Sequence, residues 1–97
     1  MRYEIQLSPD AVDDLRSVKA NIRVGVLDVI EETLRYEPEK ESKSRIKRLN
    51  GLSRSQYRLR VDEYRIYYDI SGNFVQILAL VSKEQSVSWL EREGVKK

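Results

Sequence analysis

The chain has 97 residues, a formal net charge of +2, and neither cysteine nor histidine. This length predicts one domain, residues 1–97, built around a single core of modest size. The missing residue types exclude disulfides, cysteine nucleophiles, the commonest general base and the commonest metal ligand, so we expect no metal site and no cofactor. Any chemistry must then rest on Lys, Arg, Tyr and carboxylates.

The first half of the chain predicts a strand followed by two helices. Residues 2–8 alternate apolar and polar side chains, as a half-buried strand does. Ser8 and Pro9, followed by acidic residues, are typical of a helix start. Apolar residues then recur at helical spacing in two segments, with a break near residues 19–21 and a stop at Pro38. We therefore expect a two-helix hairpin after the first strand.

The second half predicts a sheet and a closing helix. After a polar loop at 37–44, the segments 45–49, 56–61, 63–70 and 74–81 alternate or are continuously apolar, and turn residues separate them at 50–51, 62–63 and 71–73. Residues 83–93 predict a short helix with Val87 and Leu90 facing inward and Gly94 as its stop. This order predicts an α+β fold, in which the helix pair covers one face of a mainly antiparallel sheet with three to four strands after the first.

Hydropathy indicates no membrane segment. No apolar stretch approaches the roughly 20 residues that span a bilayer, and the first ten residues lack the apolar core of a signal peptide. We therefore expect a cytoplasmic protein without a membrane partner.

The charges are distributed unevenly along the chain. Residues 40–65 contain nine basic and three acidic side chains, a net charge of +6, so the remainder carries −4. Such asymmetry within a small domain predicts one surface that faces a polyanion.

The strand pattern places the basic residues of the second half on one sheet face. Side chains alternate along a strand, so Arg58 and Arg60 share a face, and Arg65 and Tyr67 join them if the two strands pair through a tight turn. We expect this face to be exposed. A solvated polar face is one interpretation, but clustered like charges repel, and a bound polyanion relieves that repulsion. Arginine also suits bidentate phosphate contact, and Tyr67 or Trp89 suits stacking on an unpaired base.

The order of elements and one long sequence segment together resemble a known family. The order of elements, with "LNGLSRSQYRLRVDEYRIYYDI" followed by an apolar strand and "VSKEQSVSWL", resembles the RelE/ParE superfamily of toxins from bacterial type II toxin-antitoxin systems. The resemblance covers essentially the whole chain, and its most specific part is the pattern L-x-G…Y-R-L-R-x-x-x-Y-R-I-x-Y. It implies a RelE-like fold and a cognate antitoxin as partner in a hetero-oligomeric complex.

The resemblance also implies a function. Toxins of the RelE branch enter the ribosomal A site and cut messenger RNA by setting a ribose 2′-hydroxyl against the adjacent phosphate. We expect this ribosome-dependent endoribonuclease activity, which inhibits translation. The alternatives are a ParE-like inhibitor that binds DNA gyrase without catalysis, and a degenerate member that binds partners but is not toxic.

Candidate site residues follow from the matching positions. The resemblance implies catalytic groups that stabilise charge on the phosphorane-like transition state: Arg58, Arg60, Arg65 and Lys83. The expected RNA-binding residues are Lys43, Lys47, Arg48, Tyr67 and Trp89.

The chain departs from the family at positions that matter for proton transfer. Arginine stands at 58 and 60, where well-known relatives have lysine, and tryptophan stands at 89 in place of tyrosine. Arginine does not readily act as a general base, and an indole stacks on a base but exchanges no proton. Lys43, Lys47 and Glu84 remain candidates for the proton transfer. Packing is the alternative role of Tyr67, and core packing or contact with the antitoxin is the alternative role of Trp89.

Overall fold

The computed structural model describes residues 2–49 and 55–94 and confirms the α+β class. In chain order its elements are β1 (Glu4–Leu7), α1 (Pro9–Ser17), α2 (Ala20–Thr33), β2 (Ile46–Arg48), β3 (Tyr57–Val61), β4 (Tyr64–Ser71) and β5 (Phe74–Ser82). A C-terminal segment, residues 83–94, follows as a 3₁₀ turn, the short helix α3 (Ser86–Trp89) and a π-helical turn. The turn expected at residues 50–51 lies outside the described residues.

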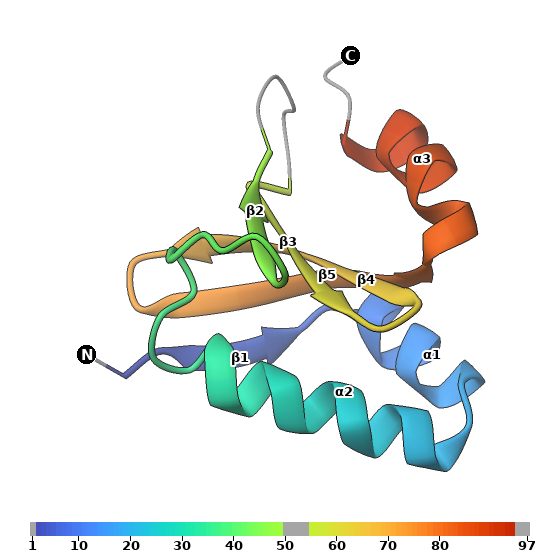
Figure 1. Cartoon of the computed structure of the whole chain (residues 1–97), viewed down its shortest axis with the longest axis horizontal. Coiled ribbons are helices and arrows are strands. Elements are labelled where there is room, and N and C mark those ends of the chain that lie inside the picture. The colour runs from blue at the N-terminus through green and yellow to red at the C-terminus, as the bar shows by residue number, and fades with distance from the viewer. Residues whose placement is uncertain (1, 50–54, 95–97) are drawn as a thin grey trace.

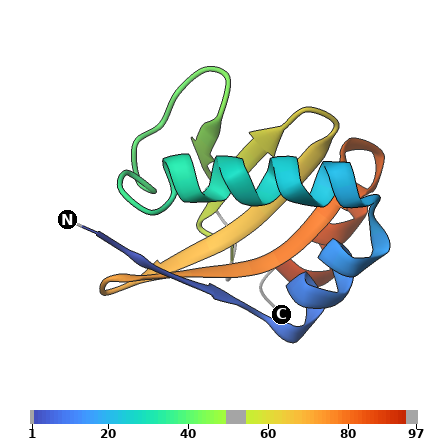
Figure 2. The same ribbon diagram turned by 90° about the horizontal axis from the view of Figure 1, so that it is seen from below.

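The five strands form one sheet in the order β1-β5-β4-β3-β2. Every neighbouring pair is antiparallel except β1 and β5, which run parallel. α2 crosses one face of the sheet, and the C-terminal segment lies on the opposite face (Figures 1 and 2). The larger hydrophobic cluster fills the space between the sheet and the helices α1 and α2, and a smaller one forms beneath α3.

The predicted start of the first helix is confirmed. Ser8 is the N-cap: its hydroxyl accepts a hydrogen bond from the Ala11 N–H and donates one to the Leu78 carbonyl of β5. The second helix is shorter than expected, because α2 ends at Thr33, with Leu34 as its C-cap, and does not continue to Pro38.

The C-terminal segment differs from its prediction in which side chains face the sheet. Val87 is 65% exposed, so its expected inward position is wrong, whereas Trp89 is only 7% exposed. The segment begins as a 3₁₀ turn, with three residues per turn, and this shifts the helical phase that the sequence pattern assumes. Leu90 packs against the smaller cluster, as expected.

None of the helices within residues 2–49 and 55–94 is long and apolar enough to cross a membrane.

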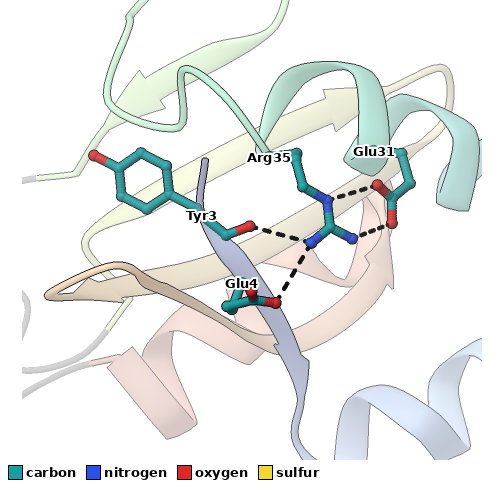
Figure 3. A network of polar contacts seen from close by, with 4 residues as sticks. All are labelled: Tyr3, Glu4, Glu31 and Arg35. Carbon is teal, nitrogen blue, oxygen red and sulfur yellow. Dashed lines mark hydrogen bonds and ion pairs between the residues drawn. The ribbon is translucent and has the colours of Figure 1, made fainter. Parts of the chain in front are cut away.

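Arg35, just after α2, connects this helix to the edge strand β1 (Figure 3). Its Nε donates to the Glu31 carboxylate at 2.8 Å, and its Nη1 donates to the Tyr3 carbonyl at 3.1 Å and lies 3.8 Å from the Glu4 carboxylate. The Arg35 carbonyl in turn accepts from the Tyr3 N–H at 2.7 Å. Side chain and backbone of one residue therefore both hold β1 against the end of α2.

We predict that Arg35→Ala lowers the midpoint of thermal unfolding by a few degrees. In this variant the Tyr3 carbonyl loses its guanidinium donor and the Glu4 carboxylate loses its ion-pair partner. Lys40→Ala is the matched control, since Lys40 forms an exposed ion pair with Glu37 and such pairs contribute little. Thermal unfolding followed by circular dichroism measures both variants. Equal midpoints for the two variants would contradict the proposed role of Arg35.

Asp14 of α1 completes the hydrogen bonding of β5 beyond the end of β1. Its Oδ2 accepts from the Leu80 N–H at 2.9 Å. Burial raises the pKa of Asp14 above its ordinary value; the Leu80 N–H opposes this rise, and the nearby Asp10 and Asp13 add to it. The folded protein therefore holds the Asp14 proton more tightly than the unfolded chain does.

This raised pKa predicts a pH-dependent effect of Asp14→Asn. Wild-type stability contains a contribution that falls as pH rises from the ordinary value of 3.8 through the raised folded pKa, because the folded state binds the proton more tightly. The Asn variant keeps an acceptor for Leu80 but does not titrate. We expect its stability relative to wild type to increase between pH 4 and pH 7 in thermal unfolding. A constant or decreasing difference would show that the Asp14 carboxyl is not destabilised by burial.

Candidate functional site

The β3–β4 hairpin sets the positions of the basic side chains. The strands are joined by Asp62 and Glu63, and Asp62 adopts a positive φ of 50°. The resulting register pairs Arg58 with Tyr67 and Arg60 with Arg65, which confirms the expected pairing. Asp is one of the few residues that tolerate this left-handed conformation, so the sequence suits the tight turn.

β2 adds one more cation to the same row. Lys47 is the register partner of Arg58, so it lies on the same side of the sheet. We call the sheet face opposite α2 the basic face; it carries Lys47, Arg58, Arg60 and Arg65. The three ion pairs found within residues 2–49 and 55–94 all involve Arg35 or Lys40. No carboxylate in those ranges therefore pairs with this cluster.

Arg58 is the most constrained cation of the basic face. Its side chain is half-buried, and its Nε is fully buried with no hydrogen-bond partner among the described residues. Burial lowers the pKa of Arg58, and the positive charges of Arg65 and Arg60 lower it further. The guanidinium nevertheless stays protonated at neutral pH. A buried donor without an acceptor is costly, and an anionic oxygen at this point removes that cost.

Arg65 is not exposed, and the expectation that it is solvent-facing is wrong. The residue is 8% exposed, and its Nη1 donates to the carbonyls of Asp62 at 3.1 Å and Tyr64 at 3.0 Å. The guanidinium folds back over the tight turn because those carbonyls need donors. Arg65 therefore stabilises the end of the hairpin and adds positive charge near Arg58. Its register partner Arg60 is exposed.

Tyr67 and Trp89 form a stacked pair inside the smaller hydrophobic cluster. Their ring centroids are 4.6 Å apart with an interplanar angle of 11°, and the residues are 1% and 7% exposed. This is the packing role that the sequence left open for both. Contact of either ring with RNA stays a prediction, and it requires the stack to open.

The remaining candidates, Lys43, Lys83 and Glu84, lie outside the strands that form the basic face. Lys43 is exposed in the loop before β2, and Lys83 is exposed at the start of the C-terminal segment, where its N–H donates to the Glu63 carbonyl. Glu84 follows in the same exposed turn. The structure therefore places Lys83 beside the β3–β4 hairpin end and leaves Lys43 on the loop.

Arg48 belongs to the opposite side of the sheet. It is the register partner of Tyr57, donates from Nη1 to the Tyr57 hydroxyl at 2.8 Å, and lies 5.2 Å from the ring centroid. Tyr57 belongs to the cluster under α2. The structure thus separates Arg48 from Lys47, its neighbour in sequence, because adjacent residues of a strand face opposite ways.

The structure also contains a cleft away from the basic face. A cleft of about 890 Å³ between α1 and the C-terminal segment is lined by Asp10, Asp13 and Asp14. Arg92 also lines this cleft, but the three aspartates outweigh its charge and repel a polyanion, so we place the candidate site on the basic face. Within the described ranges, no group of three metal-binding side chains comes together.

The sequence pattern did not indicate the burial of Arg58 or Arg65. Alternation along the strands reports which face a side chain occupies but not what covers that face. The one available signal was the register partner of Arg58, because Tyr67 is bulky and apolar enough to exclude water beside it.

The sequence matches the model of a known protein family. The family model described as "ParE toxin of type II toxin-antitoxin system, parDE" matches residues 5–87. None of the curated proteins matches the sequence.

Several solved structures are similar. The archaeal RelE-RelB complex from Pyrococcus horikoshii OT3 has a chain with 26% identity and a TM-score of 0.70, covering 86% of this chain and 97% of that one. A toxin-antitoxin complex of the RelBE type from Mycobacterium tuberculosis gives 23% identity and 0.68, covering 84% and 99%. A mutant of the E. coli toxin RelE in the free state gives 18% and 0.74, covering 96% and 99%. The match over residues 5–87 shows that the chain belongs to the ParE toxin family of type II toxin-antitoxin systems, within the RelE/ParE superfamily.

Proposed function

We propose that this toxin cuts messenger RNA on the ribosome, and that the basic face holds the phosphate at which the strand is cut. The buried Nε of Arg58 carries this proposal: it has no hydrogen-bond partner among the described residues, and an anionic oxygen that reaches it as the strand binds would satisfy it. Arg60 and Arg65 lie opposite each other on β3 and β4 and add positive charge, and no described carboxylate forms an ion pair with either. The similarity to the archaeal RelE chain supports the same reading.

The proposed reaction is an internal transfer at phosphorus. The ribose 2′-oxygen forms a bond to the adjacent phosphorus while the bond from phosphorus to the 5′-oxygen breaks, which leaves a 2′,3′-cyclic phosphate and a 5′-hydroxyl. The 2′-hydroxyl proton passes to water, and the leaving 5′-oxygen takes up a proton. Arg58 and Arg60 stabilise the extra negative charge at phosphorus. We assign protonation of the leaving oxygen to Lys47, because it is the register partner of Arg58 and, unlike arginine, can give up a proton.

The partner in the resting state is a cognate antitoxin. Similar chains were solved in complexes with the antitoxin RelB, and a type II toxin needs a protein antitoxin. We propose that acidic side chains of the antitoxin cover the basic face and so supply the carboxylates that the described part of the toxin lacks there. Lys43 and Lys83 extend this surface at either side.

Gyrase inhibition is the second candidate function. The matching family model is the one named for ParE, and arginine and tryptophan occupy the positions where proton-transferring residues were expected. Under this alternative the basic face binds a protein or DNA surface without chemistry.

Induced expression of the chain without antitoxin tests the proposal, with mapping of messenger RNA 5′ ends. We expect new ribosome-dependent 5′ ends, and we expect Arg58→Ala to lower the cleavage rate about 100-fold to 1,000-fold, as loss of a transition-state donor does. Arg16→Ala, which removes an exposed cation from α1, is the charge-matched control and should cleave normally.

A supercoiling assay with purified gyrase and a growth assay without antitoxin separate the alternatives. If messenger RNA stays intact and the chain stops purified gyrase from supercoiling DNA, gyrase inhibition replaces cleavage as the function. Normal growth and normal supercoiling would identify a non-toxic member.

The two faces of β2 provide a further prediction. Lys47→Gln should weaken binding of a short single-stranded RNA and reduce the magnitude of the slope of log K against log salt by about 0.7, because one phosphate contact is lost. Arg48→Gln removes an identical charge from the adjacent residue on the opposite face and should leave the slope unchanged. Fluorescence anisotropy at several salt concentrations measures both. Equal slopes for the two variants would exclude the basic face as the RNA-binding surface.

A further inference from the structure

Trp89 is the main apolar anchor of the C-terminal segment. Val87 points to solvent, and of the described side chains in α3 only Trp89 is buried. The indole lies against Tyr67, and Leu78 and Ala79 of β5 complete the cluster around the stacked rings. The position of this segment is therefore tied to the position of one tyrosine ring.

Tyr67 links that ring stack to the basic face. It is the register partner of Arg58 across the β3–β4 pair, on the same side of the sheet. Directly paired residues of antiparallel strands have Cβ atoms about 4.5–5.5 Å apart, so the two side chains are neighbours on that face. Tyr67 is 1% exposed and thus cannot leave its place without disturbing the stack.

We infer that Trp89 is a positioning residue: it fixes Tyr67, and Tyr67 in turn holds the Arg58 side chain, with its buried Nε, in the place from which it meets a phosphate oxygen once the strand binds. This inference rests on the proposed function for its catalytic consequence. In this role Trp89 acts from inside the fold through Tyr67 and needs no contact with the RNA base. Tryptophan suits it, because an indole offers a large flat surface for stacking on a phenol ring.

The state of the Arg58 Nε–H provides a direct readout that does not depend on RNA. In a protein labelled with ¹⁵N, a buried Nε–H exchanges with water more slowly than an exposed one. We expect Arg58 to exchange at least about tenfold more slowly than the exposed Arg60 in the wild type.

Trp89→Leu is the test variant, because it keeps apolar volume in the cluster but cannot stack as an indole does. We expect its Arg58 Nε–H to exchange about as fast as that of Arg60. Trp89→Phe retains an aromatic ring and should restore slow exchange. Val87→Leu changes an exposed residue two positions earlier and should behave as wild type. Far-UV circular dichroism verifies the fold, and Trp89→Met replaces Trp89→Leu if the latter does not fold.

Cleavage assays with ribosomes and messenger RNA give the functional readout. We expect Trp89→Leu to lower kcat by about 10-fold to 100-fold with little change in KM, since a misplaced charge-stabilising group affects the chemical step while Lys47 and Arg60 still bind the strand. Trp89→Phe should recover most of the rate.

The two readouts separate the inference from the proposed function. Unchanged slow exchange of the Arg58 Nε–H in a folded Trp89→Leu variant would overturn the positioning role, whatever the cleavage rate. If the wild type cuts no messenger RNA but Trp89→Leu still accelerates the exchange, the proposed function fails and the positional coupling stands.

Discussion

The register between β3 and β4 is the constraint on which the rest of the structure depends. A turn of only Asp62 and Glu63, with Asp62 at positive φ, leaves the two strands one way to pair. A slip of one residue would send Arg58 into the core and Leu59 to the surface, because side chains alternate strictly along a strand. The same turn thus decides which residues fill the core under α2 and which cations share the basic face.

The basic face lowers the stability of the free protein but suits the binding of an anion. Three guanidiniums on two adjacent strands repel one another, and none has a carboxylate partner within residues 2–49 and 55–94. Arg65 offsets part of this cost through the carbonyls of the turn, but Arg58 keeps a buried donor unsatisfied. Residues that break local rules in this way are typical of functional sites, and an antitoxin or an RNA strand supplies the missing anions.

Local rules predicted much of this arrangement. The Ser8 cap, the strand segments and the pairing of Arg58 with Tyr67 and of Arg60 with Arg65 follow from caps, alternation and turn length, and all are confirmed. The parallel pairing of β1 with β5, the burial of Arg65 and the inward position of Trp89 did not follow. These depend on which elements meet in space, on carbonyls left free by a turn, and on a 3₁₀ start that changes the helical phase.

A structure of the chain bound to a ribosome that carries messenger RNA would show whether the basic face holds the phosphate at which the strand is cut. We expect a phosphate oxygen at hydrogen-bond distance, about 3 Å, from the Arg58 Nε, with the strand lying across β2, β3 and β4 on the basic face. A message that contacts the α2 side of the sheet, or an Arg58 Nε that keeps no partner in the complex, would contradict this expectation.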